Sequence, residues 1–190
     1  MIRSMQDPRI VVLEPPSIRR QAEFLEAARR SRRLHGRWVT PPRTTEEYLA
    51  LLRRARSPSR FAHFVCLPQG DLVGVINISE VVRGVFESGY LGFYAFVPHA
   101  GQGFMRAGLG LVVDRAFRSY GLHRLEANVQ PENLRSQALV QDLGFRLEGY
   151  SPRYLKIAGK WCDHERWALT IEDWKKSRKA ARSASRTMPR

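Results

Sequence analysis

Cysteine is scarce in this chain, with only Cys66 and Cys162 among 190 residues. There is also no run of about 18 consecutive apolar residues, the length a membrane span requires. The first ten residues contain no apolar segment of the kind found in secretory signals. We therefore expect a cytoplasmic protein with reduced thiols and no membrane partner. The 43% of hydrophobic residues excludes a disordered or collagen-like chain.

Acidic residues are few as well: 18 Asp and Glu stand against 32 Lys and Arg, a net charge of +14. Such an excess suits polyanionic partners such as RNA, although solubility alone also explains it. Residues 175–190 hold seven basic residues and no acidic one. We expect one domain over residues 1–174, followed by a basic, disordered tail over 175–190 that contacts RNA or the ribosome or is simply solvated. The five histidines and two cysteines show no ligand spacing, so no metal is expected.

Hydrophobic periodicity and turn residues predict alternating helices and strands. One capping signal is clear, because Thr44 and Glu47 form a capping box at a helix start. Gly144 suits the left-handed position that ends a helix. Strands are expected at 9–13, 61–67, 72–79, 88–97, 124–129, 154–157 and 161–170, and helices from Ser17, from Thr44, over 104–120 and over 134–143. This order predicts a mixed α/β domain with helices packed on a central sheet.

A glycine-containing loop joins the strand that ends near Val97 to the next helix. Backbone N–H groups at such a helix start, here about Gly101 to Arg106, form a site for phosphate or pyrophosphate. No Gly-Lys-Ser/Thr follows, so the loop is not a P-loop, and the strand before it is expected to be antiparallel, unlike a dinucleotide fingerprint. An ordinary strand-to-helix turn is the alternative.

A second segment, RLEANVQPENLRSQALVQDLGFRLEGY, runs from a strand through Asn133 and Ser136 into a helix that ends at Leu-Gly-Phe. Together with Gly-Gln-Gly in the first loop, and with the runs GYLG and WCDH, it resembles the GNAT superfamily of acetyl-CoA-dependent N-acetyltransferases. The similarity spans about residues 72–174 and is strongest to the RimJ-type branch, the ribosomal-protein alanine N-acetyltransferases. This resemblance implies a GNAT fold with a central, mostly antiparallel twisted sheet flanked by helices.

The same resemblance implies acetyl-CoA as donor substrate and the N-terminal α-amine of a protein, such as a ribosomal protein, as acceptor. It assigns the coenzyme A pyrophosphate to the loop and the pantetheine arm to the region of Asn133, which could instead cap its helix. The residues implied to contact the coenzyme are Phe96, Val97, Gly101, Gln102, Gly103, Phe104, Met105, Arg106, Asn133 and Ser136. Backbone N–H groups near Phe96 and Val97 are expected to polarise the thioester carbonyl and to hold the oxyanion. Ala100 stands where the superfamily usually has Arg or Gln, and His99 or Arg106 would have to compensate.

Two side chains are the expected catalytic residues. Ser136 would donate to the departing thiolate as general acid or hydrogen-bond its sulfur, unless it only caps its helix. Glu126 would act as base through a water, unless it is a solvent-facing strand residue, and Glu87 is a distant second. A modest base suffices because an α-amine, with a pKa of about 7.7–8.0, is partly neutral at pH 7. Asp163 and His164 are expected near the acceptor groove.

Two other functions remain open. One is acetylation of a small amine such as a polyamine or aminoglycoside, which the basic composition disfavours because a cationic acceptor prefers an acidic groove. The other is an RNA- or ribosome-binding module on a GNAT fold with weak catalysis, which Ala100 would permit.

Overall fold

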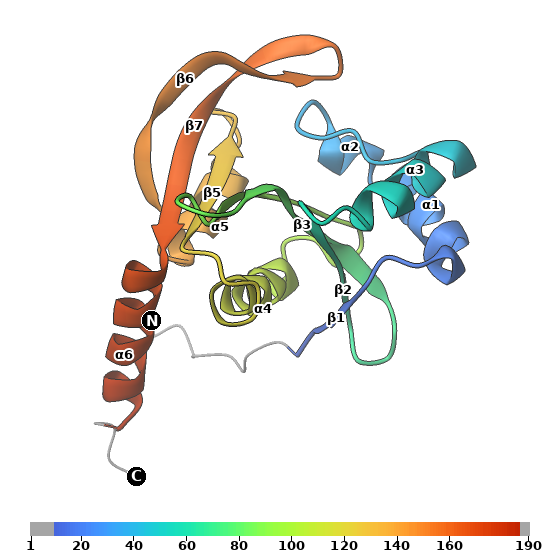
Figure 1. The fold of residues 1–190 in the computed structure, drawn as a ribbon. Helices are drawn as coiled ribbons and strands as arrows, with labels where there is room; N and C mark the ends of the chain where they lie inside the picture. Colours follow the sequence, from blue (N-terminus) through green and yellow to red (C-terminus); the bar gives the residue numbers. More distant parts are fainter. Residues whose placement is uncertain (1–9, 187–190) are drawn as a thin grey trace, which may run out of the picture.

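The computed structural model describes the backbone of residues 10–186 and the side chains of residues 10–180. One seven-stranded sheet has the order β1-β2-β3-β4-β5-β7-β6. Figure 1 shows how the helices are arranged around it. Its strands are β1 (Val12–Glu14), β2 (Phe61–Cys66), β3 (Leu72–Val82), β4 (Ser88–Ala95), β5 (Arg124–Val129), β6 (Arg146–Ile157) and β7 (Lys160–Thr170). The helices are α1 (Gln21–Arg30), α2 (Arg32–His35), α3 (Thr45–Ala55), α4 (Phe104–Arg118), α5 (Leu134–Asp142) and α6 (Ile171–Arg186).

Every strand pair is antiparallel except β4 and β5, which are parallel and are joined through α4. The predicted mixed fold with a mostly antiparallel sheet is therefore confirmed. The expectation that the strand before the glycine loop is only antiparallel is wrong. That strand, β4, is antiparallel to β3 but parallel to β5, so strand, loop and helix form a crossover unit.

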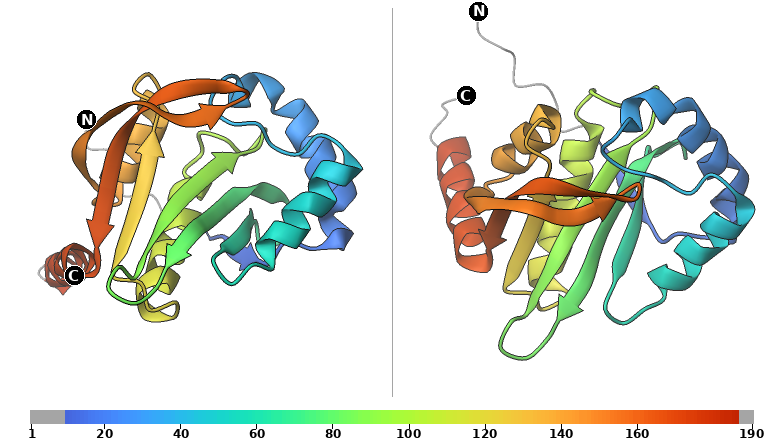
Figure 2. Two further views of the ribbon diagram at one scale, coloured as in Figure 1. Left: turned by 45° about the horizontal axis from the view of Figure 1, so that its top comes forward. Right: turned by 90° about the horizontal axis from the view of Figure 1, so that it is seen from above.

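Two hydrophobic cores lie on opposite faces of the sheet. Helices α4 and α5 cover one face, where Leu109, Leu125 and Val140 are fully buried. Helices α1 and α3 cover part of the other, where Phe24 and Tyr48 pack on strand residues. Figure 2 shows the long β6–β7 hairpin bending over the sheet toward α1 and α2. The second face is thus framed by helices on one side and by the hairpin on the other.

The helix starts differ in detail from the sequence prediction. Ser17 makes no side-chain capping bond, and a short 3₁₀ turn at Ile18–Arg20 precedes α1. Thr44 does cap α3, since its hydroxyl accepts from the Glu47 N–H at 3.3 Å. The Glu47 carboxylate, however, accepts from the N–H of Arg43 at 2.6 Å and not from that of Thr44. The capping box is therefore present with its return bond displaced by one residue.

Strand β6 begins at Arg146, eight residues before the predicted start at 154. Its pairing with β7 shifts register between Leu147 and Gly149 and again between Ser151 and Leu155. Such irregularities break the two-residue alternation by which a strand is recognised in sequence. The predicted turn at 158–159 does join β6 to β7. The helix stop at Gly144 is confirmed by its φ of +89°.

The predicted disorder from residue 175 is wrong as far as Arg186, because α6 continues through that segment. Residues 187–190 lie outside the described part of the chain. The helix is anchored on α4, since Asp114 accepts from the Trp174 indole N–H at 2.9 Å and from the Arg178 guanidinium at 2.7 Å. None of the described helices has the length and apolar character required to cross a membrane.

Candidate active site

The central feature of the site is a split between β4 and β5. These strands pair only from Ser88 with Arg124 to Tyr90 with Glu126, and no further pairing follows. The N–H of Phe96 donates to Val73 on β3 at 2.7 Å. Because successive N–H groups of a strand point to opposite sides, the amides of Phe93 and Ala95 point away from β3, into the split. Two backbone donors thus face a gap in the sheet.

The predicted carbonyl-polarising amides are already bonded within the chain. Phe96 donates to Val73, and Val97 donates to the hydroxyl of Ser31 at 3.0 Å. Ser31 and Phe96 are fully buried, so neither amide reaches a ligand. The backbone donors that face the split are those of Phe93 and Ala95 on β4, which precede the two predicted residues. Sequence could not reveal this, because the side to which an amide points depends on strand register.

The glycine loop has the geometry of a phosphate cradle. Gly101 and Gly103 have φ of +77° and +86°, and Gly103 is the N-cap of α4. A Cβ at Gly101 would meet no atom within 4 Å, so the loop is open there. The first turn of a helix leaves N–H groups without an intrahelical acceptor, which here include those of Met105 and Arg106, and no acidic residue occupies that turn. The donor set therefore fits a pyrophosphate.

Two side chains near Ala100, those of His99 and Arg106, are the candidates to replace the missing phosphate contact. His99 packs edge-on against the ring of Phe104, with centroids 6.2 Å apart. Arg106 lies 3.6 Å from Asp142, with both side chains largely exposed, and such pairs contribute little to stability. The Gln102 side chain donates to the carbonyl of Pro98 at 2.7 Å and closes the loop. Arg106 is thus the cation beside the cradle that can turn toward a phosphate.

The start of α5 places Asn133 and Ser136 together. Asn133 Oδ1 accepts from the Ser136 N–H at 3.3 Å, so Asn133 does cap the helix. Within the described chain its amide NH₂ has no partner, which leaves a donor for a ligand carbonyl. The Ser136 hydroxyl also lacks a partner among the described residues, so it is not itself a cap. Both side chains are half-buried.

Glu126 belongs to a charged cluster at the end of the β4–β5 pairing. Its carboxylate accepts from the Arg124 guanidinium at 2.9 Å, and Arg124 also binds Glu148 on β6. Hydrogen bonding to Tyr154 raises the pKa of Tyr90 to about 12, with burial and the nearby Glu126 charge acting in the same direction. Glu126 therefore sits beside the split, with one oxygen committed to Arg124.

Glu87 lies at the opposite end of β4 from the split. Its side chain is exposed, and its carbonyl accepts from the N–H of His123 at 2.7 Å. It therefore belongs to a loop and not to the site.

Asn128 is a site residue that the sequence analysis did not name. Leu125, Ala127 and Val129 point into the α4 core, so Glu126 and Asn128 share the opposite face of β5. The Oδ1 atom of Asn128 is buried and has no hydrogen-bond partner. A buried acceptor without a partner costs about 1–3 kcal/mol, which suggests that a ligand satisfies it. In the sequence, the two-residue spacing from Glu126 already indicates that both side chains lie on one face of the strand.

Asp163 and His164 hold the β6–β7 hairpin together. Asp163 accepts from the Tyr150 hydroxyl and from the Arg153 N–H, and these bonds lower the pKa of its carboxyl. His164 is buried, its Nδ1 lies 3.0 Å from the Cys162 carbonyl, and burial lowers the pKa of its imidazole. Both side chains are thus engaged within the hairpin. Among residues 10–186, no group of three His, Cys, Asp or Glu side chains could hold a metal ion.

A family model for the acetyltransferase (GNAT) domain matches residues 11–146. The chain therefore belongs to the GNAT acetyltransferase family, whose members use acetyl-CoA. It is 42% identical over 104 residues to the [ribosomal protein uS5]-alanine N-acetyltransferase of Escherichia coli K12, covering 55% of this chain and 54% of that protein. Its alignments with the first curated relatives span 54% to 62% of their length.

Solved structures extend the likeness over most of the chain. Mycobacterium smegmatis RimJ in complex with CoA-disulfide superimposes with a TM-score of 0.79 at 28% identity, covering 92% of this chain and 91% of that one. A Vibrio cholerae spermidine N-acetyltransferase in complex with CoA and spermine has a TM-score of 0.75 at 19% identity, covering 87% of this chain and 98% of that one. The second comparison shows a shared fold only.

Proposed function

We propose that this chain transfers the acetyl group of acetyl-CoA to the N-terminal α-amine of a protein, most simply a ribosomal one. The observation that carries the proposal is the split between β4 and β5, with the Phe93 and Ala95 amides facing it and the glycine cradle at the end of the same strand. The proposal of a protein N-terminus as acceptor is supported by the 42% identity to the [ribosomal protein uS5]-alanine N-acetyltransferase.

The side chains around the split suit direct attack of an amine on a thioester. Acetyl-CoA supplies an activated acyl carbon and a thiolate leaving group. The Phe93 and Ala95 amides stabilise the negative charge that develops on the carbonyl oxygen as the C–N bond forms. Glu126, through a water, accepts a proton from the attacking amine. The Ser136 hydroxyl donates a hydrogen bond to the departing sulfur as the C–S bond breaks, and the released thiolate then takes up a proton from solvent.

A polyamine is the second candidate acceptor. The fold shared with the spermidine acetyltransferase favours it. The net charge of +14 opposes it, because a polycation is repelled by a basic protein. The two candidates differ in the acceptor and not in the donor, so one assay separates them.

The deciding experiment incubates the protein with acetyl-CoA and either short peptides beginning with Ala or Ser, or spermidine, and follows thiol release and product mass. We expect acetylated peptide, and no product from the same peptide with a blocked N-terminus. Acetylation of spermidine with no acetylated peptide would refute the proposal. In cells, loss of the chain should remove N-terminal acetylation from specific proteins by mass spectrometry.

A further inference from the structure

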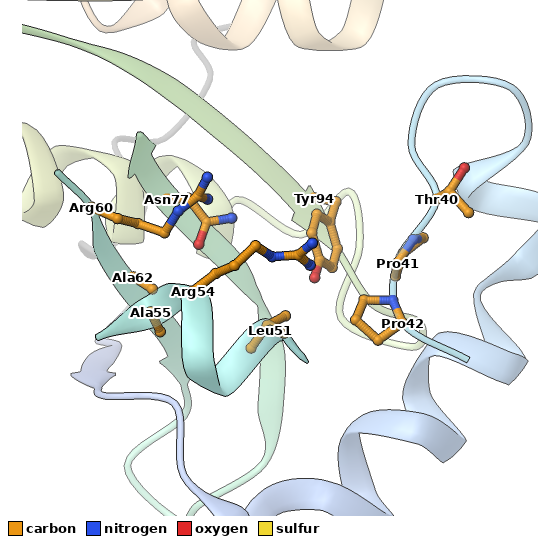
Figure 3. Close-up of a pocket in the computed structure, with 10 residues that line it drawn as sticks. All are labelled: Thr40, Pro41, Pro42, Leu51, Arg54, Ala55, Arg60, Ala62, Asn77 and Tyr94. Atoms are coloured by element: carbon orange, nitrogen blue, oxygen red, sulfur yellow. The ribbon is translucent and has the colours of Figure 1, made fainter. Parts of the chain in front are cut away.

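A cavity of about 200 Å³ lies on the same face of the sheet as the split, beneath the segment Thr40–Pro42. Figure 3 shows its lining. Helix α3 contributes Arg54, and the strands contribute Asn77 and Tyr94. Arg60, at the entrance to β2, completes a wall that carries two guanidinium groups and no acidic side chain.

The two arginines are left without counterions. Among the described residues, neither Arg54 nor Arg60 forms an ion pair or a side-chain hydrogen bond. Burial lowers the pKa of the Arg60 guanidinium, and the positive charge of Arg54 lowers it further, while Glu80 acts weakly in the opposite direction. Arg60 is half-buried and Arg54 is exposed at the mouth of the cavity. Two like charges that act on each other across one cavity favour an anion between them.

The Tyr94 hydroxyl adds a hydrogen-bond donor at the same place. Burial raises the pKa of this hydroxyl far above its ordinary value, so it stays protonated, and Arg54 lies close enough to act on it electrostatically. In Figure 3 the Arg54 side chain extends from α3 toward Tyr94. Guanidinium and phenol donors converging on one cavity are the groups that bind a carboxylate.

The cavity is connected to the split by a row of small or polar residues across the sheet. Ala62 pairs with Asn77, and Asn77 pairs with Gly92. A Cβ added at Gly92 would meet no atom within 4 Å, so the surface above it is open. Since Tyr90 pairs with Glu126, two residues further along the parallel strands Gly92 lies across the split from Asn128. The exposed Gly92 thus lies between Asn128 and the cavity, where an extended acceptor chain can cross the sheet.

Resting on the function proposed above, we infer that this cavity binds an acidic side chain near the N-terminus of the acceptor protein. Two strand spacings, about 10 Å, separate the split from the cavity. An extended chain advances about 3.3–3.6 Å per residue. An Asp or Glu as second or third residue therefore reaches the two arginines while its α-amine lies at Asn128. The same charges repel a polyamine, so the cavity sets the acceptor class.

The test compares two peptides that differ only in Glu or Gln at the second or third position. For the natural chain we expect kcat/KM to be about tenfold higher with Glu, mainly through KM, as one charge-assisted bond provides. Arg54→Gln and Arg60→Gln should each reduce that ratio toward one. Arg54→Glu should reverse it in favour of Lys at the same position. Arg53→Gln is the matched control, because Arg53 and Arg54 are both exposed on the last turn of α3 and only Arg54 lines the cavity.

Calorimetry with the acetylated Glu and Gln product peptides and coenzyme A gives a second readout that does not need turnover. We expect tighter binding of the Glu product, and loss of the difference in Arg54→Gln. If both peptides are acetylated with equal kcat/KM, or if Arg53→Gln changes the ratio as much as Arg54→Gln, this inference fails while the proposed function stands. If neither peptide is acetylated, the proposed function fails. In that case calorimetry still tests the cavity, and equal binding of the two product peptides would overturn this inference as well.

Discussion

The hydroxyl of Ser31 accepts a hydrogen bond from the backbone N–H of Val97 at 3.0 Å, across 66 residues of sequence. The imidazole Nε2 of His35 lies 2.8 Å from the carbonyl of Ala95 in the same region. The segment after α1 therefore holds the end of β4 where the glycine loop begins. It occupies the Val97 N–H and the Ala95 carbonyl there.

The glycine cradle can be tested at Gly103. Gly103→Val places a β-branched residue at a φ of +86°, where a side chain costs about 1–2 kcal/mol, and brings methyl groups toward the phosphates. We expect affinity for coenzyme A to fall at least about tenfold by calorimetry, with a small loss in Tm. Gly110→Ala in the same helix, where a Cβ meets nothing within 4 Å, is the control and should bind normally. Unchanged affinity in Gly103→Val would contradict the cradle.

Ser136 is expected to act on the leaving group. Ser136→Ala should lower kcat about tenfold and leave the dissociation constant of acetyl-CoA nearly unchanged, because the bond strengthens only as the thiolate forms. Ser136→Thr retains the hydroxyl and should recover most of the activity. Steady-state kinetics with a peptide acceptor provide the measurement. Equal turnover in Ser136→Ala would leave this residue with no part in the reaction.

Asn128 is expected to contribute to acceptor binding and not to the stability of the fold. Asn128→Leu removes an oxygen that is buried without a partner, so the free energy of unfolding should stay level or rise by about 1 kcal/mol. The same change should raise KM for the peptide severalfold, because the acceptor amine loses its bond. Urea unfolding and peptide kinetics give the two readouts. A large loss of stability with normal KM would show that the oxygen has a structural role.

Glu126 should matter most when the amine is protonated. Glu126→Gln is expected to lower kcat/KM several-fold at pH 7 and less at pH 9, because an α-amine with a pKa near 8 is already mostly neutral at the higher pH. Glu148→Gln is the matched control, since Glu148 binds the same Arg124 but lies on β6. Identical pH profiles for the two variants would indicate that Glu126 acts only through the ion-pair cluster.

The basic C-terminal segment is proposed to contact RNA or the ribosome. Removing residues 180–190 deletes three arginines but keeps Arg178, which binds Asp114. Acetylation of a free peptide should be unchanged, while binding to ribosomal particles should weaken at low salt. The log–log salt slope should flatten by about 0.7–0.9 for each phosphate that the shortened chain no longer binds. Equal binding of both chains across a salt series would show that residues 180–190 are only a solvated end.

Local patterns predicted much of the fold. The alternation of Leu125, Ala127 and Val129 defined β5, and the Thr44 cap placed the start of α3, because both signals depend on nearby residues alone. The glycine loop and the Asn133–Ser136 segment were likewise recognisable, since short-range backbone geometry requires particular residues there. The C-terminal helix was missed because its charge favoured disorder, whereas Trp174 and Arg178 anchor it on Asp114.

What the sequence by itself determined was the strand–loop–helix order and the family to which the chain belongs. Only the tertiary structure decided which donors face the ligand. The backbone N–H of Val97 is bonded to Ser31, whereas the backbone N–H groups of Phe93 and Ala95 point into the split. Asn128 lies beyond the last paired residues of β4 and β5. These relationships depend on strand register and on contacts between residues far apart in the chain. A sequence pattern cannot express them, because a shift of one residue in register turns every side chain to the other face.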